Sequence, residues 1–543
     1  MNGELHKKRV AVIGAGASGL AAIKSCVDEG LQPVCFERVD EVGGLWYYTD
    51  HVRPGQGCVM KSTTMNTCKE MMCFSDFPPA PELPNFMNQK QVWTYFNKYK
   101  EHFDLQKYIH FNTEVVSVSQ ANDFDQSGCW TIKTRNHMTG KDTTNIFDGV
   151  LVCTGHHAEK HSPKFPGLES FEGEVVHSHD YKERRRLEGK KVLIIGIGNS
   201  GGDLAVELAP VCKVLISTRR GTWIRTRVTG KGLPMDMVNT NRWKKTMRSL
   251  LPTSFYASYV AKKLNQRIDH DLCSLRPVHS PFDQVCMVND DLGTRISCGS
   301  VTVKTNVQRV TSRAVEFADG SVEDDVDVII LATGYVFGFP FIDTSILDVQ
   351  ENKIELYKFV FPPDLAHPTL AIIGCIQPLG AIMPISEMQS RLAAGVIKGS
   401  LTLPSRDDMW SDVRRKQEEL KRQYVESQRH TIMVDFLPFM DELAELVGCK
   451  PNIGQLMMRD PRLAIQVMFG PCSPYQFRLT GPGAWTGARD AILTQWQRVV
   501  SHLHTRQLPS SDIKSTASVS ISIATVVFLG VLLFFCQHVL SWR

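Results

Sequence analysis

Residues 9–37 read RVAVIGAGASGLAAIKSCVDEGLQPVCFE, and this stretch decides the fold of the N-terminal part of the chain. The β-branched run of residues 10–13 is typical of a buried parallel strand. The pattern G-x-G-x-x-G follows, formed by Gly14, Gly16 and Gly19. Its glycines allow the turn, admit a pyrophosphate close to the backbone and let the next helix pack on the strand. A purely structural turn is the alternative, but the flanking strand and helix patterns and Glu37, placed to bind a ribose diol, favour a dinucleotide-binding unit.

The glycine pattern recurs in residues 191–219, KVLIIGIGNSGGDLAVELAPVCKVLISTR, where it is formed by Gly196, Gly198 and Gly201. The spacing from the first glycine to the end of the second strand is the same in both units. The acid of the first unit is replaced here by Arg219, which Arg220 follows. An acid repels a 2′-phosphate, whereas arginines bind one through charge-assisted hydrogen bonds. The first unit therefore suits FAD and the second NADPH, which predicts electron transfer from NADPH to a flavin.

The bulk composition is that of a globular protein with reduced cysteines. The 543 residues suffice for about two or three domains, and a hydrophobic content of 43% excludes a disordered chain. The 15 cysteines are irregularly spaced and form no CxxC pair, which favours a reducing, cytosolic environment.

The strand patterns indicate that one domain is inserted into another. Residues 148–155 form a strand ending in Thr-Gly, and residues 327–335 repeat this pattern. The sequence therefore predicts an α/β fold with two Rossmann-like domains, in which an FAD domain contains an inserted NADPH domain. The predicted boundaries are 1–156 for the first part of the FAD domain, 157–330 for the NADPH domain with a basic aromatic insertion at 219–290, and 331–510 for the returning FAD domain with a C-terminal region facing substrate and membrane. Outside the glycine units, we expect a helix at 91–102, a strand at 108–118 and a solvent-exposed charged helix at 409–428.

The C-terminus is typical of a membrane anchor. Residues 518–540 are mostly apolar, contain no Asp, Glu, Lys or Arg, and follow a polar linker at 511–517. About 20 such residues cross a bilayer, so the sequence predicts a transmembrane tail anchor with the folded body in the cytosol. A buried core helix is the alternative interpretation.

A basic stretch with interleaved aromatic residues occupies residues 219–267, which hold twelve Lys or Arg and one acid. Such a pattern is compatible with nucleic acid, a membrane surface or a plain solvated face. Because of the predicted anchor, we expect this stretch to contact membrane lipid and expect no nucleic-acid partner. Its aromatic residues are Trp223, Trp243, Phe255, Tyr256 and Tyr259.

The motif Phe171-x-Gly173-x-x-x-His177-x-x-x-Tyr181, just before the second glycine unit, matches the identifying motif of flavin-containing monooxygenases. Residues 68–74 (CKEMMCF) and 332–335 (ATGY) are also similar to that family. From the first glycine unit to the tail, the chain resembles the microsomal, dimethylaniline monooxygenase type. The stretches GIGNSGGD at 196–203 and QPLG at 377–380 resemble the subgroup associated with Baeyer–Villiger oxidation of ketones.

The resemblance implies an NADPH- and oxygen-dependent FAD enzyme that inserts one oxygen atom into amines, sulfides or ketones through a 4a-hydroperoxyflavin. It implies dioxygen and small lipophilic molecules as partners and a place in the endoplasmic reticulum membrane. It leaves a homo-oligomer open, and no metal site is expected. Two alternatives use the same residues: an NADPH oxidase that releases hydrogen peroxide, and a catalytically silent flavin- or NADPH-binding membrane protein.

The resemblance also implies particular site residues. Asn66 and Asn199 are the expected catalytic residues, although an Asn in the setting of Asn66 is by itself more typical of a turn, and Asn199 is equally typical of a simple turn amide. For His177 a structural role is favoured. The expected cofactor-binding residues are Gly14, Ala15, Gly16, Ala17, Ser18, Gly19, Glu37, Gly44, Leu45, Trp46, Met65, Thr67, Gly196, Gly198, Ser200, Gly201, Gly202, Thr218, Arg219, Arg220, Thr333 and Gly334.

Cys68 and Cys73 have the C-x4-C spacing of the redox pair in flavin disulfide reductases, which also carry two dinucleotide units. In that family the first cysteine follows the glycine pair of the flavin loop almost at once. Here Cys68 lies far beyond Gly44, and no glycine flanks the pair. The sequence therefore disfavours a disulfide reductase.

The arginines of the second unit generate a prediction on coenzyme choice. Replacing Arg219 with Glu should raise the Michaelis constant for NADPH much more than that for NADH, because the carboxylate repels a 2′-phosphate. A lost charge-assisted contact corresponds to about 1.5–3 kcal/mol, which is tenfold or more in affinity. Steady-state kinetics with both coenzymes measure the effect, and an unchanged preference would contradict the assignment.

Overall fold

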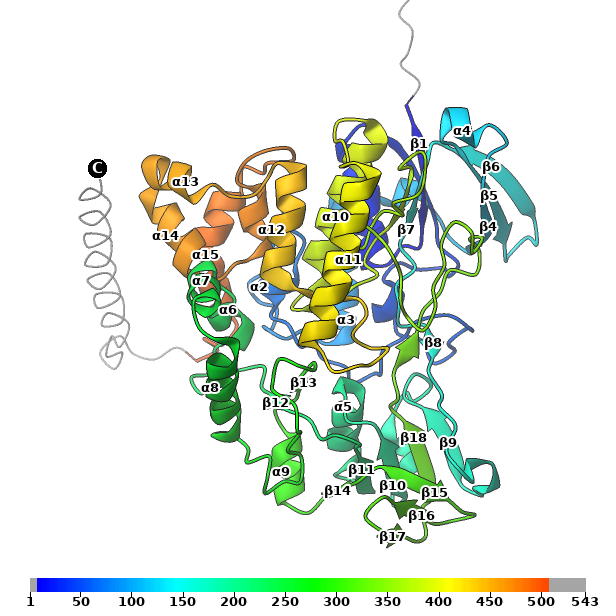
Figure 1. Ribbon diagram of the computed structural model, residues 1–543, viewed down its shortest axis with the longest axis vertical. Helices are drawn as coiled ribbons and strands as arrows, with labels where there is room; N and C mark the ends of the chain where they lie inside the picture. Colours follow the sequence, from blue (N-terminus) through cyan, green and yellow to red (C-terminus); the bar gives the residue numbers. More distant parts are fainter. Residues whose placement is uncertain (1–6, 507–543) are drawn as a thin grey trace, which may run out of the picture.

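Two five-stranded parallel sheets form the framework of the molecule (Figure 1). The computed structural model describes residues 7–506. The first sheet has the order β20-β7-β1-β2-β3, with the bounds Leu370–Ile372, Gly149–Val152, Arg9–Ile13, Gln32–Phe36 and Ile109–His110. The second has the order β14-β11-β10-β18-β9, with the bounds Val301–Lys304, Lys213–Ser217, Lys191–Ile195, Val328–Leu331 and Glu174–His177.

The two sheets repeat one plan. Each central strand, β1 or β10, leads through a glycine turn into a helix, α1 (Ala17–Asp28) or α5 (Asn199–Leu208). Each sheet is accompanied by a three-stranded antiparallel sheet: β4 (Thr113–Gln120), β5 (Trp130–Asn136) and β6 (Asp142–Phe147) in one case, and β15 (Val307–Val310), β16 (Val315–Phe317) and β17 (Val322–Glu323) in the other. The two sheets differ in the chain position of one outer strand. In the first sheet, β20 follows all strands of the second sheet in the chain, whereas in the second sheet β9 precedes the central strand β10. The chain therefore leaves the first sheet after β7 and returns to it at β20.

Close packing explains the first and third glycines of each turn. Gly14 has φ +98°, and a Cβ there would lie 2.9 Å from the Cys153 carbonyl oxygen. A Cβ on Gly19 would lie only 1.8 Å from the carbonyl oxygen of Gly14. The second unit repeats this contact, with 2.0 Å between a Cβ on Gly201 and the Gly196 carbonyl oxygen. Any side chain at the third position would push the helix off its strand.

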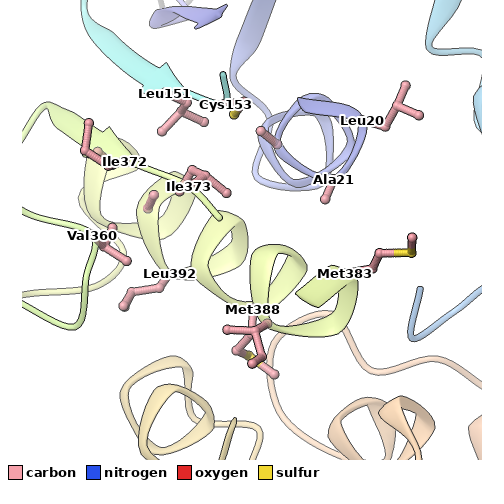
Figure 2. Close-up of a cluster of buried hydrophobic side chains, with 14 of the residues drawn as sticks. Leu20, Ala21, Leu151, Cys153, Val360, Ile372, Ile373, Met383, Met388 and Leu392 are labelled. Carbon is pink, nitrogen blue, oxygen red and sulfur yellow. The ribbon is translucent and has the colours of Figure 1, made fainter. Parts of the chain in front are cut away.

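Helices of the C-terminal part cover the first sheet. Helix α10 (Ile382–Lys398) is buried over almost its whole length and packs against α1. Figure 2 shows part of this core, with side chains of Leu20 and Ala21 from α1, Leu151 from β7, Ile372 from β20, and Met388 and Leu392 from α10. The remaining helices are α2 (Lys69–Met72), α3 (Gln89–His102), α4 (Phe124–Ser127), α6 (Met235–Asn239), α7 (Arg242–Ser249), α8 (Thr253–Asn265), α9 (Leu292–Ser297), α11 (Arg406–Gln423), α12 (Phe436–Val447), α13 (Ile453–Arg459), α14 (Pro461–Phe469) and α15 (Ala488–Ser501).

Short strand pairs connect these parts. Strands β8 (Glu159–Lys160) and β19 (Tyr335–Val336) pair where the chain passes between the two sheets. Strands β12 (Ile224–Arg225) and β13 (Met287–Val288) pair with each other, and α6, α7 and α8 lie between them in the chain. Strands β21 (Gln377–Leu379) and β22 (Met433–Asp435) join the segment after β20 to the segment after α11.

One predicted strand differs from the structure, and one predicted segment lies outside the described residues. The strand expected at 108–118 is wrong as a single element, because Asn112 has φ +52° and separates β3 from β4. No helix within residues 7–506 is long and apolar enough to cross a membrane. The predicted anchor at 518–540 and its linker at 511–517 lie outside the described residues.

A buried ion pair fixes the segment that follows Asn66. Glu70 in α2 is completely buried and accepts hydrogen bonds from Arg498 Nε at 2.9 Å and Nη2 at 2.7 Å. The Tyr475 hydroxyl donates a third, at 2.8 Å. The neighbouring Lys69 is also inaccessible and donates to the carbonyl oxygens of Pro81 and Leu83, at 2.9 and 2.6 Å. The strong desolvation of these charges is thus matched by several hydrogen bonds.

A second ionic cluster fixes the other end of the same segment. Arg478 lies 2.5 Å from Glu387 of α10 and 3.1 Å from Asp76, and all three side chains are buried. Ser75 donates to both oxygens of Glu387, from its backbone N–H at 2.8 Å and its hydroxyl at 2.7 Å. Asp76 also pairs with Lys24 of α1. Residues 69–76 are therefore tied to three separate parts of the fold.

Breaking the first ion pair should destabilise the protein strongly. Arg498→Met leaves the Glu70 carboxylate buried without its cation, which typically costs about 3–5 kcal/mol. Arg489→Met is the matched control on the same helix, because Arg489 is half-exposed and pairs with Asp460 at 2.6 Å. Such a surface pair contributes about 1 kcal/mol or less. Thermal melting of the two variants measures the difference.

Adding Glu70→Gln to Arg498→Met should recover part of the loss, because the buried charge is then removed. Equal melting temperatures for Arg498→Met and Arg489→Met would contradict the ionic role of this contact.

Candidate functional site

A cavity of about 970 Å³ lies between the parts of the chain that carry the two glycine units. Its walls come from the second glycine unit, from Leu45 and Trp46, which follow the first unit in the chain, from the segment before α2 and from the loop between α11 and β22. It brings together thirteen of the expected site residues: Leu45, Trp46, Met65, Asn66, Gly196, Gly198, Asn199, Ser200, Thr218, Arg219, Arg220, Thr333 and Gly334. The other eleven do not line this cavity: Gly14, Ala15, Gly16, Ala17, Ser18, Gly19, Glu37, Gly44, Thr67, Gly201 and Gly202.

The first glycine turn is organised around Glu37. The buried carboxylate accepts hydrogen bonds from the N–H groups of Ala15 at 2.7 Å and Val39 at 3.1 Å. Burial raises its pKa, while these backbone donors and Arg38 counteract the shift. Each oxygen keeps a lone pair for a further donor. A ribose diol on Glu37 and a pyrophosphate at the N-terminus of α1 fit this arrangement.

The second glycine turn opens into the cavity. A Cβ on Gly198 would meet no atom within 4 Å, so space remains directly above the turn. This space lies at the N-terminus of α5, whose unpaired N–H groups favour an anion. By contrast, a Cβ on Gly202 would lie 2.1 Å from the Met287 sulfur, so a side chain at this position would displace Met287. The turn thus offers a cradle that fits a pyrophosphate.

Arg219 and Arg220 stand at the end of β11, line the cavity and are exposed. Neither has an ion-pair partner within residues 7–506. Their charges are therefore available to a ligand phosphate. Sequence reasoning missed a third arginine, Arg429, which lines the same cavity from the α11–β22 loop. No local pattern marks that residue, because only the tertiary fold brings it here.

Asn66 presents an unsatisfied amide to the cavity. Its Oδ1 is buried and has no hydrogen-bond partner, which is costly unless a ligand supplies a donor. The neighbouring Met65 carbonyl accepts a hydrogen bond of 3.2 Å from Arg227, and Arg227 in turn pairs with Asp290 at 3.0 Å. The structure therefore links the Asn66 loop to the region that follows the second glycine unit.

Asn199, the other amide expected to be catalytic, uses its side-chain oxygen in a hydrogen bond within the protein. Its Oδ1 accepts a 2.9 Å hydrogen bond from the Val288 N–H. The residue still lines the cavity at the first position of α5. Its position therefore joins β13 to the glycine turn.

Histidines form an uncharged part of the wall at neutral pH. His156 and His157 line the cavity directly after the Thr154-Gly155 turn. Burial, with a smaller effect of His157, lowers the pKa of His156, and burial lowers that of His157 to about 4. His177 instead belongs to β9, does not line the cavity, and accepts a 3.1 Å hydrogen bond from the His179 N–H. This placement supports the structural role predicted for His177.

Cys68 and Cys73 do not form a redox pair. Both are buried free thiols, and neither lines the cavity. Burial raises the pKa of each well above its ordinary value, so both stay protonated and unreactive. The Cys73 thiol donates to the Tyr475 hydroxyl at 3.2 Å. These contacts agree with the sequence argument against a disulfide reductase.

Comparison with known proteins identifies relatives over nearly the whole chain. Residues 7–536 match the family described as Flavin-binding monooxygenase-like. The sequence is 50% identical to flavin-containing monooxygenase 5 of Rattus norvegicus, over 97% of this chain and 99% of the rat protein. It is 44% identical to dimethylaniline monooxygenase [N-oxide-forming] 2 of Mus musculus, over 97% of this chain and 98% of the mouse protein.

Solved structures share the fold. The S-allyl-L-cysteine S-oxygenase of Allium sativum is 26% identical with a TM-score of 0.61, covering 84% of this chain and 94% of its own. The open crystal structure of cyclohexanone monooxygenase is 18% identical with a TM-score of 0.60, covering 82% of this chain and 98% of its own. The second likeness concerns the fold alone.

Proposed function

Because the chain belongs to the flavin-binding monooxygenase-like family, we propose that its cavity is where NADPH, FAD, dioxygen and an organic substrate meet. The bound flavin supplies the redox chemistry, taking a hydride from NADPH and activating dioxygen. The substrate class is small lipophilic amines, sulfides or ketones. The observation that carries the proposal is the cavity that joins the second glycine turn to Leu45 and Trp46, which follow the first unit in the chain, and to the Asn66 loop.

The first glycine unit would bind FAD through its ADP part. Glu37 would orient the ribose, and the turn from Gly14 to Gly19 would present the N-terminus of α1 to the pyrophosphate. Trp46 and Leu45 line the cavity beyond this turn, where a flat ring system would reach it. The FAD site would therefore extend from the buried carboxylate to the cavity wall.

The second glycine unit would bind NADPH. The open space over Gly198 accommodates the pyrophosphate, and Arg219 and Arg220 supply positive charge for the 2′-phosphate. Such units bind a dinucleotide across the crevice at which the strand order reverses, which here lies between β10 and β18. The nicotinamide half would therefore lie on the β18 side. That direction leads towards Thr333 and Gly334, which also line the cavity.

The chain's own groups would bind, orient and exclude water rather than transfer protons. Neutral histidines and apolar side chains such as Met60, Phe337 and Ile432 form much of the wall. The Asn66 amide offers donor and acceptor groups without adding charge. The ionic clusters of residues 69–76 hold its loop in position, as close placement of reacting groups requires.

The choice between heteroatom and ketone substrates is also part of the proposal. The relatives include flavin-containing monooxygenase 5 at 50% identity and an N-oxide-forming enzyme at 44%. The resemblance of residues 196–203 and 377–380 to the subgroup associated with Baeyer–Villiger oxidation supports oxidation of ketones in addition to amines and sulfides. A panel containing a tertiary amine, a sulfide and an aliphatic ketone tests this, and absence of ester product from every ketone would contradict it.

We further propose that the protein is held at the endoplasmic reticulum membrane with its body in the cytosol. The predicted anchor at 518–540 supports this, and so does the surface of α7 and α8. Leu250, directly after α7, is 71% exposed and Phe255 of α8 is 64% exposed, and several lysines and arginines lie on these two helices. Cations around exposed apolar residues suit an anionic lipid surface.

Asn66→Ala should separate NADPH oxidation from product formation. Hydride transfer depends on the stacking of the two cofactors, so it should continue. Oxygen transfer requires support of the reactive oxygen site, so product per NADPH should fall and hydrogen peroxide should rise. Loss of one buried hydrogen-bond partner costs about 1–3 kcal/mol, which is roughly five- to 150-fold if it falls on one step. Product, peroxide and NADPH are measured together.

Asn97→Ala is the matched control, because Asn97 lies on α3 outside the cavity and its side chain bonds, among residues 7–506, only the Trp93 carbonyl, at 3.2 Å. Asn66→Asp should also slow flavin reduction, since a carboxylate opposes the gain of electrons nearby. If Asn66→Ala formed as much product per NADPH as the wild type, at unchanged flavin content, Asn66 would be only a turn residue.

A chain that ends at Ser510 should retain flavin and NADPH oxidation but lose its strongest membrane attachment. Residual binding through the basic surface of α7 and α8 should weaken with salt, because the Debye length is about 10 Å at 0.1 M. Membrane fractionation with salt and alkaline washes measures this. If the shortened protein resisted both washes, the anchor assignment would be wrong.

A further inference from the structure

Arg429 reaches the cofactor cavity from a part of the sequence far from either glycine unit. It lies in the loop between α11 and β22, and residues 426–430 of this loop all line the cavity. Its Nη2 donates a 2.6 Å hydrogen bond to the carbonyl oxygen of Thr333. The side chain is nevertheless exposed, and the space to which it is exposed includes the cavity. The guanidinium is thus oriented by the protein and open to a ligand.

The Arg429 guanidinium packs beside a glycine, Gly334. A Cβ on Gly334 would lie 3.4 Å from both Nε and Nη2 of Arg429. This distance is the lower limit of ordinary contact, and Gly334 has φ +90°, which disfavours other residues. The guanidinium therefore lies against bare backbone at the end of β18. One of its five N–H groups is used by Thr333, which leaves others for a ligand.

The charge around Arg429 is not balanced by the protein. Within residues 7–506, Arg429, Arg219 and Arg220 have no ion-pair partner, and all three line the cavity. Shielding from bulk water by the cavity walls, and then the nearby charge of Arg219, lower the pKa of Arg429. A group of cations in mutual repulsion is stabilised by a bound anion.

Other charged groups at the cavity do not cancel this excess. Lys164 adds a further cation, and Glu426 and Asp203 are the acids that line the cavity. Asp203 is already engaged, since it accepts a 3.1 Å hydrogen bond from Asn289 and lies 3.9 Å from Arg227. Glu426 is exposed. The arginines therefore outnumber the available carboxylates.

We propose that Arg429 binds a phosphate group of NADPH, so that the C-terminal part of the chain contributes directly to nucleotide affinity. The inference rests on the proposed function of the cavity. The planar guanidinium fork matches phosphate oxygens and binds them more strongly than it binds neutral acceptors. Two groups of the ligand share this chemistry: the 2′-phosphate beside Arg219 and the pyrophosphate above Gly198.

The Arg429 loop belongs to a C-terminal segment that reaches the cavity at two places. The Arg429 loop leads into β22, which pairs with β21, and Gln377 at the start of β21 also lines the cavity. Nucleotide bound to Arg429 and Arg219 would connect this C-terminal segment to the second parallel sheet. Affinity for the nucleotide is thus determined by residues that no single glycine motif contains.

The test uses the full-length protein with FAD bound. NADP⁺ and NAD⁺ are titrated separately, and the flavin absorbance change gives each dissociation constant. Arg429→Met should weaken NADP⁺ binding about tenfold. Arg422→Met is the control, because Arg422 is 82% exposed and its only ion pair is to Glu418 at 3.5 Å within the described chain. It should bind as the wild type does.

The NAD⁺ arm distinguishes the two phosphate groups. If Arg429 binds the 2′-phosphate, its loss weakens NADP⁺ and leaves NAD⁺ unchanged. If it binds the pyrophosphate, both dinucleotides weaken by the same factor. In either case the affinity of Arg429→Met should fall less steeply with added salt than that of the wild type, because one charge is missing.

The variant Arg429→Gln tests whether the loss of affinity comes from the missing charge or from a folding defect. Glutamine can still donate an N–H to the Thr333 carbonyl but carries no charge, so it should show the same loss of NADP⁺ affinity with native melting and flavin content. NADP⁺ binding by both variants within about twofold of Arg422→Met would overturn the inference. A wild-type protein that bound neither dinucleotide would instead contradict the proposed function itself.

Discussion

The contact between the third glycine of each turn and the carbonyl of the first is the constraint on which the rest of the structure depends. A Cβ would lie 1.8 Å from that oxygen at Gly19 and 2.0 Å at Gly201. Only glycine lets each helix start this close to its strand. The contact sets the direction of both helix N-termini, and thereby where a dinucleotide can approach each turn.

Buried charges hold the remaining part of the site. The segment after Asn66 is bound by Glu70 to Arg498 and, through Ser75 and Asp76, to the cluster around Arg478. Buried ion pairs are weak evidence for stability, because desolvation offsets much of their attraction. Their directional hydrogen bonds instead favour a single position for the loop. We interpret this as the means by which the Asn66 amide is held at the cavity while its oxygen stays without a protein partner.

Local sequence patterns predicted the repeated βαβ units, since a β-branched run and glycine spacing are sufficient to specify each turn. The strand expected at 108–118 failed because Asn112 adopts a left-handed conformation that no periodicity reveals. The charged helix α11 was expected and is present, but its burial of Met409 and Val413 depends on neighbours distant in sequence. Arg429 could not be found for the same reason, as its contact with Thr333 spans 96 positions.

The central claim is that NADPH and dioxygen are used together to place one oxygen atom in an organic substrate. The most direct measurement is turnover of the flavin-loaded protein with a sulfide under ¹⁸O₂, with NADPH, product and hydrogen peroxide quantified together. The account predicts one ¹⁸O atom in each molecule of sulfoxide and close to one sulfoxide per NADPH. Sulfoxide without ¹⁸O, or NADPH oxidation that yields only hydrogen peroxide at every substrate concentration, would contradict it.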